Sequence, residues 1–392
     1  GAKPDLADAD KVLSHAGALG DVEVMKKLLA AGLATRAAQR SNSSYNGLHP
    51  AFEAAIANGH KDMVRFLIEK GCDPNAATEH DRTTPLGVAA RSGAMLVALA
   101  LVEAGADVNQ RARFRASPLN AAVEGGWPAT VRALLARGAR LEVGDDGRSA
   151  LSRAVRREND EIVELLLATE LGKNQEALAA ALHAAVAARR PESVRRLVKH
   201  GVDVNARDRW GRTALHRAVG SARSVYAGSA EEPMVDLLLE LKADPNRTDD
   251  AGNTPLHVAI KGNRYDLAER LIKHGARADL YAAAALGRKD DVAKLLAKGP
   301  ELLKQPKGRL GMPLHWAAHG GDPALIALLL DRGADVFGDP QDPKRAREAP
   351  IYWAARNGHL EAVRLLLDRG ADPCGRDSRF TKTPLHGAVM YR

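Results

Sequence analysis

The sequence predicts an all-α solenoid, in which short helix pairs stack as one continuous repeat domain. The first of two signatures is the stretch 254–257, Thr-Pro-Leu-His, which returns in related form along the chain. Its copies begin at Thr84, Ser117, Thr213, Met312, Ala349 and Thr383. The second is a Gly-x-Asp-x-Asn pattern at 71–75, 105–109 and 201–205. Thr84 and Ser117 are 33 residues apart, and a fixed period of this length indicates stacked structural repeats.

Each repeat carries the local signals of two helices and two turns. Threonine before proline favours a helix start, because the hydroxyl accepts from an unpaired amide and proline suits the first helical position. A first helix over 256–261 is followed by a Lys-Gly-Asn turn at 261–263, where Gly or Asn tolerates positive φ. A second helix with apolar residues at helical spacing then ends at a glycine such as Gly370. The segment that follows, for example 208–211, predicts a tight turn that projects as a finger before the next first helix.

The pattern changes at several places along the chain. Residues 6–33 lack the Thr-Pro signature and predict a polar N-terminal capping repeat. In the repeat near Ser149, Glu158 takes the turn glycine position and 168–175 replaces the finger. An insertion at 222–232 separates two helices, and insertions of this kind are often functional. After Asp279 the finger is nearly absent, which predicts a bend in the stack.

These motif copies resemble the ankyrin-repeat family over nearly the whole length of the chain. The resemblance implies an all-α ankyrin-repeat solenoid with about 11–12 repeats. We expect one block over 1–279 with its N-terminal cap, and a second over 280–392 that is continuous with the first and ends in a half repeat. We also expect the biological chain to continue past Arg392.

Composition narrows the class of partner. The net charge of +8 favours acidic partners, although acidic residues are interleaved along the chain. Cys72 and Cys374 stand many repeats apart, so a disulfide between them is excluded on distance and a reducing compartment is favoured. No apolar run reaches the length of a membrane span. We therefore expect a cytoplasmic monomer, or a periplasmic or secreted one if a signal peptide has been removed. Alanine, arginine and glycine usage is typical of a bacterial source.

The histidines predict structure rather than chemistry. His183, His216, His257, His315 and His386 share one position in the repeat, where a local hydrogen bond in the turn region is expected and the ankyrin resemblance implies the same role. No pair of ligands has the spacing of a zinc site, and the common phosphate-loop, nucleophile-elbow and zinc-protease motifs are absent from the sequence. We expect no enzyme, no cofactor and no bound metal.

What remains is a surface rich in arginine with several aromatic residues. In the ankyrin family, partners usually bind the concave side, built from finger tips and the exposed ends of the first helices. Carried over by position, the finger candidates are Arg113, Phe114, Arg115, Arg209, Trp210, Arg212, Arg309, Arg379 and Phe380. The candidates on first helices are Arg91, Arg156, Arg157, Lys261, His319, Arg356 and Asn357. Arginine and tryptophan are enriched at binding hot spots, so the set predicts recognition of an acidic protein.

Three functional hypotheses follow. The first is a protein-interaction scaffold that presents a rigid surface to an acidic partner. The second is nucleic-acid or polyanion binding through arginine-bearing fingers, which requires a steep fall of affinity with salt. The third is that these repeats are the targeting part of a larger effector, toxin-neutralising or enzyme protein. Trp316 and Trp353 are expected to pack between repeats, whereas Trp127 is either an exposed anchor or the cover of a neighbouring turn.

Overall fold

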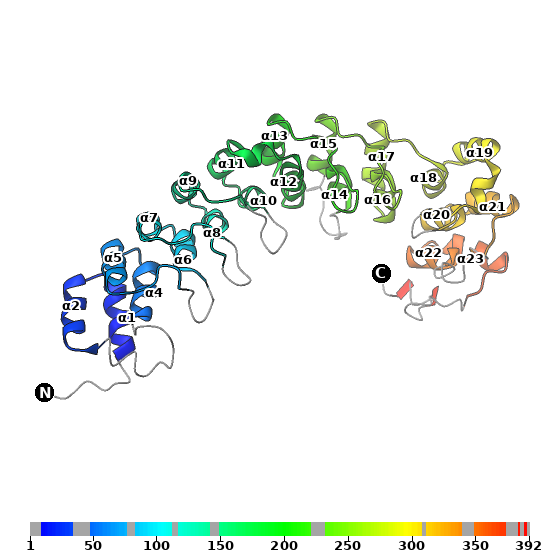
Figure 1. Ribbon diagram of the computed structural model, residues 1–392. Coiled ribbons are helices and arrows are strands. Elements are labelled where there is room, and N and C mark those ends of the chain that lie inside the picture. The colour runs from blue at the N-terminus through cyan, green and yellow to red at the C-terminus, as the bar shows by residue number, and fades with distance from the viewer. Residues whose placement is uncertain are drawn as a thin grey trace. The chain divides into compact units, whose positions relative to one another are not determined.

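A computed structural model gives the arrangement of most of the chain (Figure 1). The residues it describes are 9–33, 48–76, 83–111, 117–141, 149–220, 232–307, 311–338, 349–373, 383, 384, 388 and 389. Within them the chain forms eleven helix pairs and no named strand. The predicted all-α repeat fold is confirmed. Contacts between residues divide it into two compact units, 1–203 and 204–392, and the division expected at 279/280 stays a prediction.

Unit 1 contains the first six helix pairs. Its helices are α1 (Ala9–Leu19), α2 (Val22–Ala30), α4 (His49–Ala57), α5 (Lys61–Glu69), α6 (Pro85–Ser92), α7 (Met95–Glu103), α8 (Pro118–Gly125), α9 (Pro128–Ala136), α10 (Ala150–Arg156), α11 (Asp160–Leu167), α12 (Gln175–Ala187) and α13 (Pro191–Lys199), with a 3₁₀ turn η2 (Glu170–Lys173). The first helices pack in series, from α1 on α4 to α10 on α12. The second helices α5, α7, α9 and α11 form a parallel row.

Unit 2 has the same repeat architecture and contains five helix pairs. Its helices are α14 (Ala214–Gly220), α15 (Glu232–Glu240), α16 (Pro255–Lys261), α17 (Tyr265–Lys273), α18 (Leu280–Ala285), α19 (Lys289–Lys298), α20 (Pro313–Gly320), α21 (Pro323–Asp331), α22 (Pro350–Arg356) and α23 (Leu360–Asp368), with a 3₁₀ turn η3 (Pro300–Lys304). Here too the first helices α14, α16, α18, α20 and α22 pack in series.

The recurring histidine joins neighbouring repeats. The backbone N–H of Thr254 donates to Nδ1 of His257 at 3.1 Å. Because Nδ1 accepts this bond, Nε2 carries the proton and donates to Asp279 at 2.9 Å, one repeat further on. His216 does the same between Thr213 and the carbonyl of Asn253. The predicted local hydrogen bond is thus confirmed for these residues, and it is extended by a second bond that crosses the repeat boundary.

One histidine differs from this prediction, and another lies outside the described residues. His183 stands in the middle of the 13-residue helix α12, which begins at Gln175 rather than at the repeat's usual start. It therefore marks no helix start. The reason is that the finger is replaced by η2, and Asn174 caps the helix instead, accepting from Ala177 N–H at 3.0 Å. His386 is among the residues that the structure does not describe.

The asparagine of the second signature also links repeats. Oδ1 of Asn246 accepts from Arg277 N–H at 2.8 Å, and its Nδ2 donates to the carbonyl of Gly275 at 3.0 Å. Asn75 and Asn109 make the same two bonds to the repeats that follow them. In the Gly-x-Asp-x-Asn pattern, the asparagine therefore makes a pair of hydrogen bonds to the next layer. The sequence alone predicted only the spacing of this pattern.

The turn positions follow the sequence closely, and four described non-glycine residues adopt positive φ: Glu158, Arg189, Lys242 and Asn263. Glu158 occupies the glycine position with φ of 56°, a conformation that costs a non-glycine residue about 1–2 kcal/mol. Trp127 covers a neighbouring turn, since its indole N–H donates to the carbonyl of Arg91 at 2.9 Å, while 44% of the residue stays exposed. Both descriptions offered for Trp127 thus apply in part.

Candidate protein-interaction surface

The finger at 208–211 is a tight turn held by its own aspartate. Gly211 N–H donates to the carbonyl of Asp208 at 2.8 Å, which closes the turn, and Gly211 has φ of 71°. The carboxylate of Asp208 accepts from the N–H groups of Trp210 and Arg212, and also from Arg217 at 3.2 Å. The negative charge of Asp208 is therefore offset by these donors, and the same bonds hold the backbone of the residues at the tip in place.

The 208–211 finger is joined to the next finger, 249–252. Asp250 N–H donates to the carbonyl of Trp210 at 3.2 Å, and Arg207 pairs with the Asp250 carboxylate at 2.9 Å. Asp249 accepts from three N–H groups of its own turn, two of them from Asn253. Two neighbouring fingers therefore form one connected platform.

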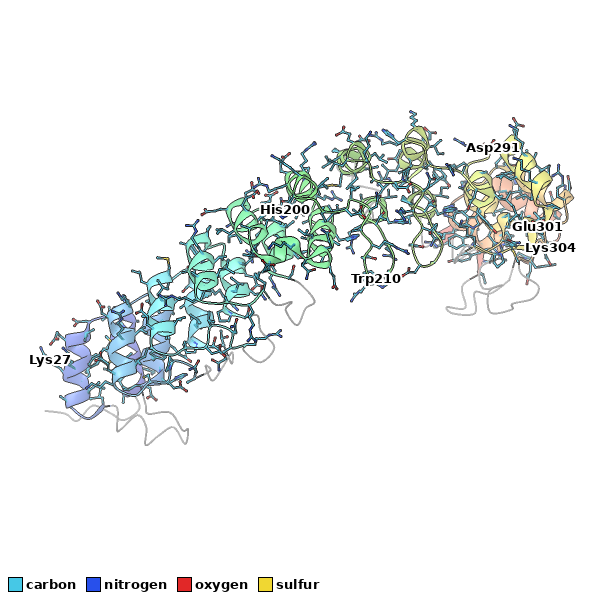
Figure 2. The ribbon with its side chains drawn as sticks, turned by 45° about the horizontal axis from the view of Figure 1, so that its top comes forward. Lys27, His200, Trp210, Asp291, Glu301 and Lys304 are labelled. Carbon is cyan, nitrogen blue, oxygen red and sulfur yellow. The ribbon has the colours of Figure 1, made fainter. Side chains whose placement is uncertain are left out.

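Two guanidinium groups lie against the exposed indole of Trp210, the finger residue labelled in Figure 2. The guanidinium of Arg209 lies 4.0 Å from the ring centroid and that of Arg212 lies 5.6 Å from it. Trp210 is 45% exposed, and both arginines are exposed. Within the described part of the chain, neither guanidinium has a carboxylate at ion-pair distance. The tip thus presents two charged donors and an aromatic face.

The other sequence candidates fall into distinct environments. Six lie outside the described residues: Arg113, Phe114, Arg115, Arg309, Arg379 and Phe380. Arg91, Arg156 and Arg157 are exposed in unit 1. Lys261, Arg356 and Asn357 are half-buried in unit 2, and His319 is only 1% exposed. A side chain as buried as that of His319 does not belong to an open binding surface.

The half-buried candidates meet around His319 because the stack turns tightly at α18. Nδ2 of Asn263, at the end of α16, donates to Oδ1 of Asn357, at the end of α22, over 3.3 Å. The backbone carbonyl of His319 accepts from Asn357 at 2.8 Å, from His359 at 3.0 Å and from the Tyr265 hydroxyl at 3.4 Å. The repeat of α16 and α17 and the repeat of α22 and α23 are thereby both tied to the end of α20. The bend that the sequence predicts at Asp279 is therefore present within unit 2.

Alanine residues explain why this approach is possible. Residues 282–285 of α18 are all alanine and all buried, so neighbouring layers come close to its axis. Trp316 on α20 reaches past them and packs edge-on against His257 of α16, with ring centroids 5.3 Å apart. The Nζ of Lys261 lies 5.2 Å from the centre of the Trp316 ring.

A second indole repeats this arrangement one layer on. Trp353, at the equivalent position of α22, lies against the ring of His319 with centroids 5.5 Å apart. The guanidinium of Arg356 lies 5.1 Å from the centre of the Trp353 ring. Both tryptophans are buried, as the sequence predicted, with exposed fractions of 0% and 9%. We call Lys261, Trp316, His319, Trp353 and Arg356 the tryptophan cluster.

Three buried polar atoms in the tryptophan cluster have no hydrogen-bond partner among the described residues. They are Nε1 of Trp316, Nε1 of Trp353 and Nδ1 of His319. Burial, together with the positive charges of Arg356, His359 and Lys261, lowers the pKa of His319 to about 4. The ring is therefore neutral near pH 7.

The pKa values of residues near the tryptophan cluster show which ionised groups are stabilised there. Burial raises the pKa of Tyr265 to about 12. Burial also lowers the pKa of His257, and its bond to Asp279 offsets only part of that effect. Burial alone would raise the pKa of Asp279, yet hydrogen bonds from His257 and Lys307 bring it well below its usual range. Carboxylates are stabilised here wherever donors reach them.

Sequence reasoning missed the indole N–H groups of Trp316 and Trp353 as functional candidates. It placed the two side chains between repeats, which is correct, but it had no means of showing their N–H groups to be unpaired. The available signal was the four-alanine run at 282–285, which allows layers to converge. In the described part of the chain, no three histidine, cysteine, aspartate or glutamate side chains come together as a metal site. None of the described helices is long and apolar enough to cross a membrane.

Helix pairs joined by fingers and stacked through recurring histidine and asparagine bonds define an all-α repeat solenoid. A sequence-family model described as ankyrin repeats (3 copies) matches residues 13–112, 109–177, 183–281, 224–306 and 280–377. The chain belongs to the ankyrin-repeat family. Ankyrin repeats generally mediate protein–protein interactions, which gives the chain its broad functional class.

Curated relatives share the repeats and not the full length. Ankyrin repeat and SOCS box protein 16 of Mus musculus is 33% identical over 199 residues, which cover 50% of this chain and 44% of that protein. The nuclear factor NF-kappa-B p105 subunit of Gallus gallus is 36% identical over 177 residues, covering 43% of this chain and 17% of that protein. A putative ankyrin repeat protein of fowlpox virus is 32% identical, with shares of 57% and 47%. The chain therefore spans less than half the length of each of these relatives.

Solved ankyrin domains align with part of the chain. The ankyrin repeat domain of Bcl-3 aligns with a TM-score of 0.48 and 29% identity, over 57% of this chain and 97% of that domain. The ankyrin repeat domain of human ASB11 aligns with a TM-score of 0.47 and 27% identity, over 58% and 99%.

Proposed function

We propose that this chain is a protein-interaction scaffold that binds an acidic segment of a partner protein. The observation that carries the proposal is the tip of the 208–211 finger, where Arg209 and Arg212 flank the exposed indole of Trp210. An arginine offers paired donors that match a carboxylate, and an exposed tryptophan adds apolar area at little entropic cost. Within unit 1, three exposed cations at first-helix ends are further candidates for contact with an acidic partner: Arg91, Arg156 and Arg157.

The hydrogen bonds and ion pairs within the fingers support this proposal. Asp208 and Asp250 are engaged by Arg217 and Arg207, so the nearby carboxylates are already occupied. The backbone of Asp208, Trp210, Gly211 and Arg212 is held by hydrogen bonds, so the finger would lose little conformational freedom on binding. The acidic partner, the participation of the finger residues, the monomeric state, the cytoplasmic location and the bacterial source are proposals.

Charge reversal at the finger tip tests the function. Full-length protein carrying Arg209→Glu and Arg212→Glu is compared with wild type for binding to fluorescent poly-L-glutamate, by anisotropy. Each lost contact at an exposed site is worth roughly 0.5–1 kcal/mol, so the double variant should bind on the order of tenfold more weakly. The matched control is Lys273→Glu, an exposed cation on α17 away from the finger. Equal affinities of the double variant and wild type would remove the finger from the interface.

The same assay distinguishes the polyanion hypothesis from binding of an acidic protein segment. A single-stranded oligonucleotide that binds more tightly than poly-L-glutamate, with affinity falling steeply as salt rises, would favour nucleic-acid binding instead. We expect poly-L-glutamate to bind more tightly than the oligonucleotide at physiological salt. The third hypothesis, a targeting part of a larger protein, is compatible with the proposed function.

A further inference from the structure

The tryptophan cluster is suited to an anion, because two of its buried side-chain donors, the indole N–H groups of Trp316 and Trp353, have no acceptor among the described residues. An indole Nε1–H can only donate, and the side chains of Lys261 and Arg356 carry donor groups alone. A buried donor that makes no hydrogen bond destabilises the fold. Two such donors, on Trp316 and Trp353, lie in adjacent layers of unit 2, each beneath a cation.

The cluster is a single site because its members converge from three repeats. The Asn263–Asn357 hydrogen bond brings the end of α16 against the end of α22. Lys261 lies over the ring of Trp316, and Arg356 lies over the ring of Trp353, which contacts His319 one turn further along α20. His319 is neutral there, and its Nδ1 has no partner among the described residues.

The charge of the surroundings selects the kind of anion. Lys261 and Arg356 are the last residues of α16 and α22, and His319 lies in the last turn of α20. The C-terminal end of a helix carries about half a negative charge, so three converging ends offset part of the two cationic charges. A singly charged ligand with two oxygen atoms matches this balance and supplies one acceptor to each indole. A doubly charged phosphate matches it less well.

We propose that the tryptophan cluster binds one carboxylate of the acidic partner, an aspartate or glutamate side chain, between the indole N–H groups of Trp316 and Trp353. This inference rests on the proposed function and names one point of recognition within it. Lys261 and Arg356 are long, half-buried side chains that lie over the indole rings. Lys261 donates to Oδ1 of Asn253, and it would exchange this neutral acceptor for the carboxylate. Both cations would turn outward to admit the carboxylate and then pair with its oxygens. The bonds formed are charge-assisted and are made away from bulk water, which strengthens them.

The test observes the indole N–H groups directly. The 392-residue chain contains four tryptophans, so ¹⁵N-tryptophan labelling gives four indole signals that single Trp→Phe variants assign. The probe is acetyl-tetraglutamate amide, and the matched peptide is acetyl-tetraglutamine amide. We expect the signals of Trp316 and Trp353 to move downfield with tetraglutamate and to stay in place with tetraglutamine. Trp127 is an internal control, since its N–H is already bonded to the carbonyl of Arg91.

Side-chain variants then test the assignment of the cations. Lys261→Gln and Arg356→Gln should each weaken the tetraglutamate-induced shifts on the order of tenfold in affinity, because each removes a charge-assisted bond. Lys273→Gln removes an equal charge from the exposed end of α17 and should leave the affinity within twofold. A loss of affinity equal to that of Lys261→Gln in this control would show that only general charge matters.

The outcomes separate this site from the proposed function. If tetraglutamate binds and moves the Trp210 signal alone, the carboxylate site is wrong and the finger interface stands. If tetraglutamate does not bind, both are overturned. If inorganic phosphate moves Trp316 and Trp353 at lower concentration than tetraglutamate does, the site recognises a different anion, and its assignment to a carboxylate is refuted.

Discussion

Replacing His319 by leucine should flatten the acid dependence of stability in unit 2. Leucine is a suitable replacement because Leu286 holds the equivalent position at the end of α18. The folded pKa of His319 is lowered from 6.5 to about 4 by burial, with Arg356, His359 and Lys261 adding to the effect. The fold therefore favours the neutral ring. Its contribution is fully present above about pH 6.5 and is lost as pH falls toward about 4.

The size of the effect follows from the two pKa values. Each unit by which folded and unfolded pKa values differ corresponds to about 1.4 kcal/mol, so His319 accounts for about 3 kcal/mol between about pH 7 and about pH 4. The pKa values of His216 and His257 are also lowered, first of all by burial, and they act in the same direction. Those two remain in the variant, so subtracting its pH profile from that of wild type isolates His319.

The assay uses the tryptophans of unit 2 as reporters. With Trp127→Phe and Trp210→Phe as background, fluorescence comes from Trp316 and Trp353, both of which are buried in unit 2. Urea unfolding is measured at intervals from about pH 7 to about pH 4, with and without His319→Leu. Wild type should lose about 3 kcal/mol more than the variant across this range. Parallel curves would refute the inference that His319 is held neutral by its surroundings.

Three further changes test how the repeats are joined. Asn246→Ala removes two bonds between layers and should lower the free energy of unfolding by about 1–3 kcal/mol in urea melts. Gly320→Ala would place a methyl carbon 1.9 Å from the carbonyl oxygen of Ala285, so it should lower the melting temperature, whereas Gly262→Ala meets its nearest atom at 3.5 Å and should not. Glu158→Gly relieves a positive φ and should stabilise its repeat by up to about 1 kcal/mol, seen as slower local hydrogen exchange.

The repeat fold could be predicted because its signals are local and recur. Thr-Pro starts and glycine stops identify helices within a few residues, and a period near 33 residues makes every copy support the others. Glu158 at a glycine position and the missing finger after Asp279 were also visible as departures from the pattern. The position of the helix start near His183 could not be predicted from the motif. Leu182 and His183 match the motif, but Asn174, nine residues before His183, caps the helix and decides where it begins.

The candidate surface could be predicted only in part, because exposure depends on how the layers curve. Register alone places Arg209 and Trp210 at a finger tip, which is where they lie. It places His319 at the same position as Lys261 and Arg356, but it cannot show that His319 is 1% exposed while the other two are half-buried. That outcome requires the contact between Asn263 and Asn357, which are 94 residues apart.

The four alanines of α18 connect the local sequence to this distant contact. Larger side chains at 282–285 would hold α16 and α20 further apart, and Trp316 would then not reach His257. The same small residues that allow the bend thus bring two indoles and two cations together, and the two indole N–H groups have no acceptor among the described residues. The short helix α18 contributes no side chain to the proposed site. It affects partner recognition because its small side chains allow the stack to curve and bring the residues of the site together.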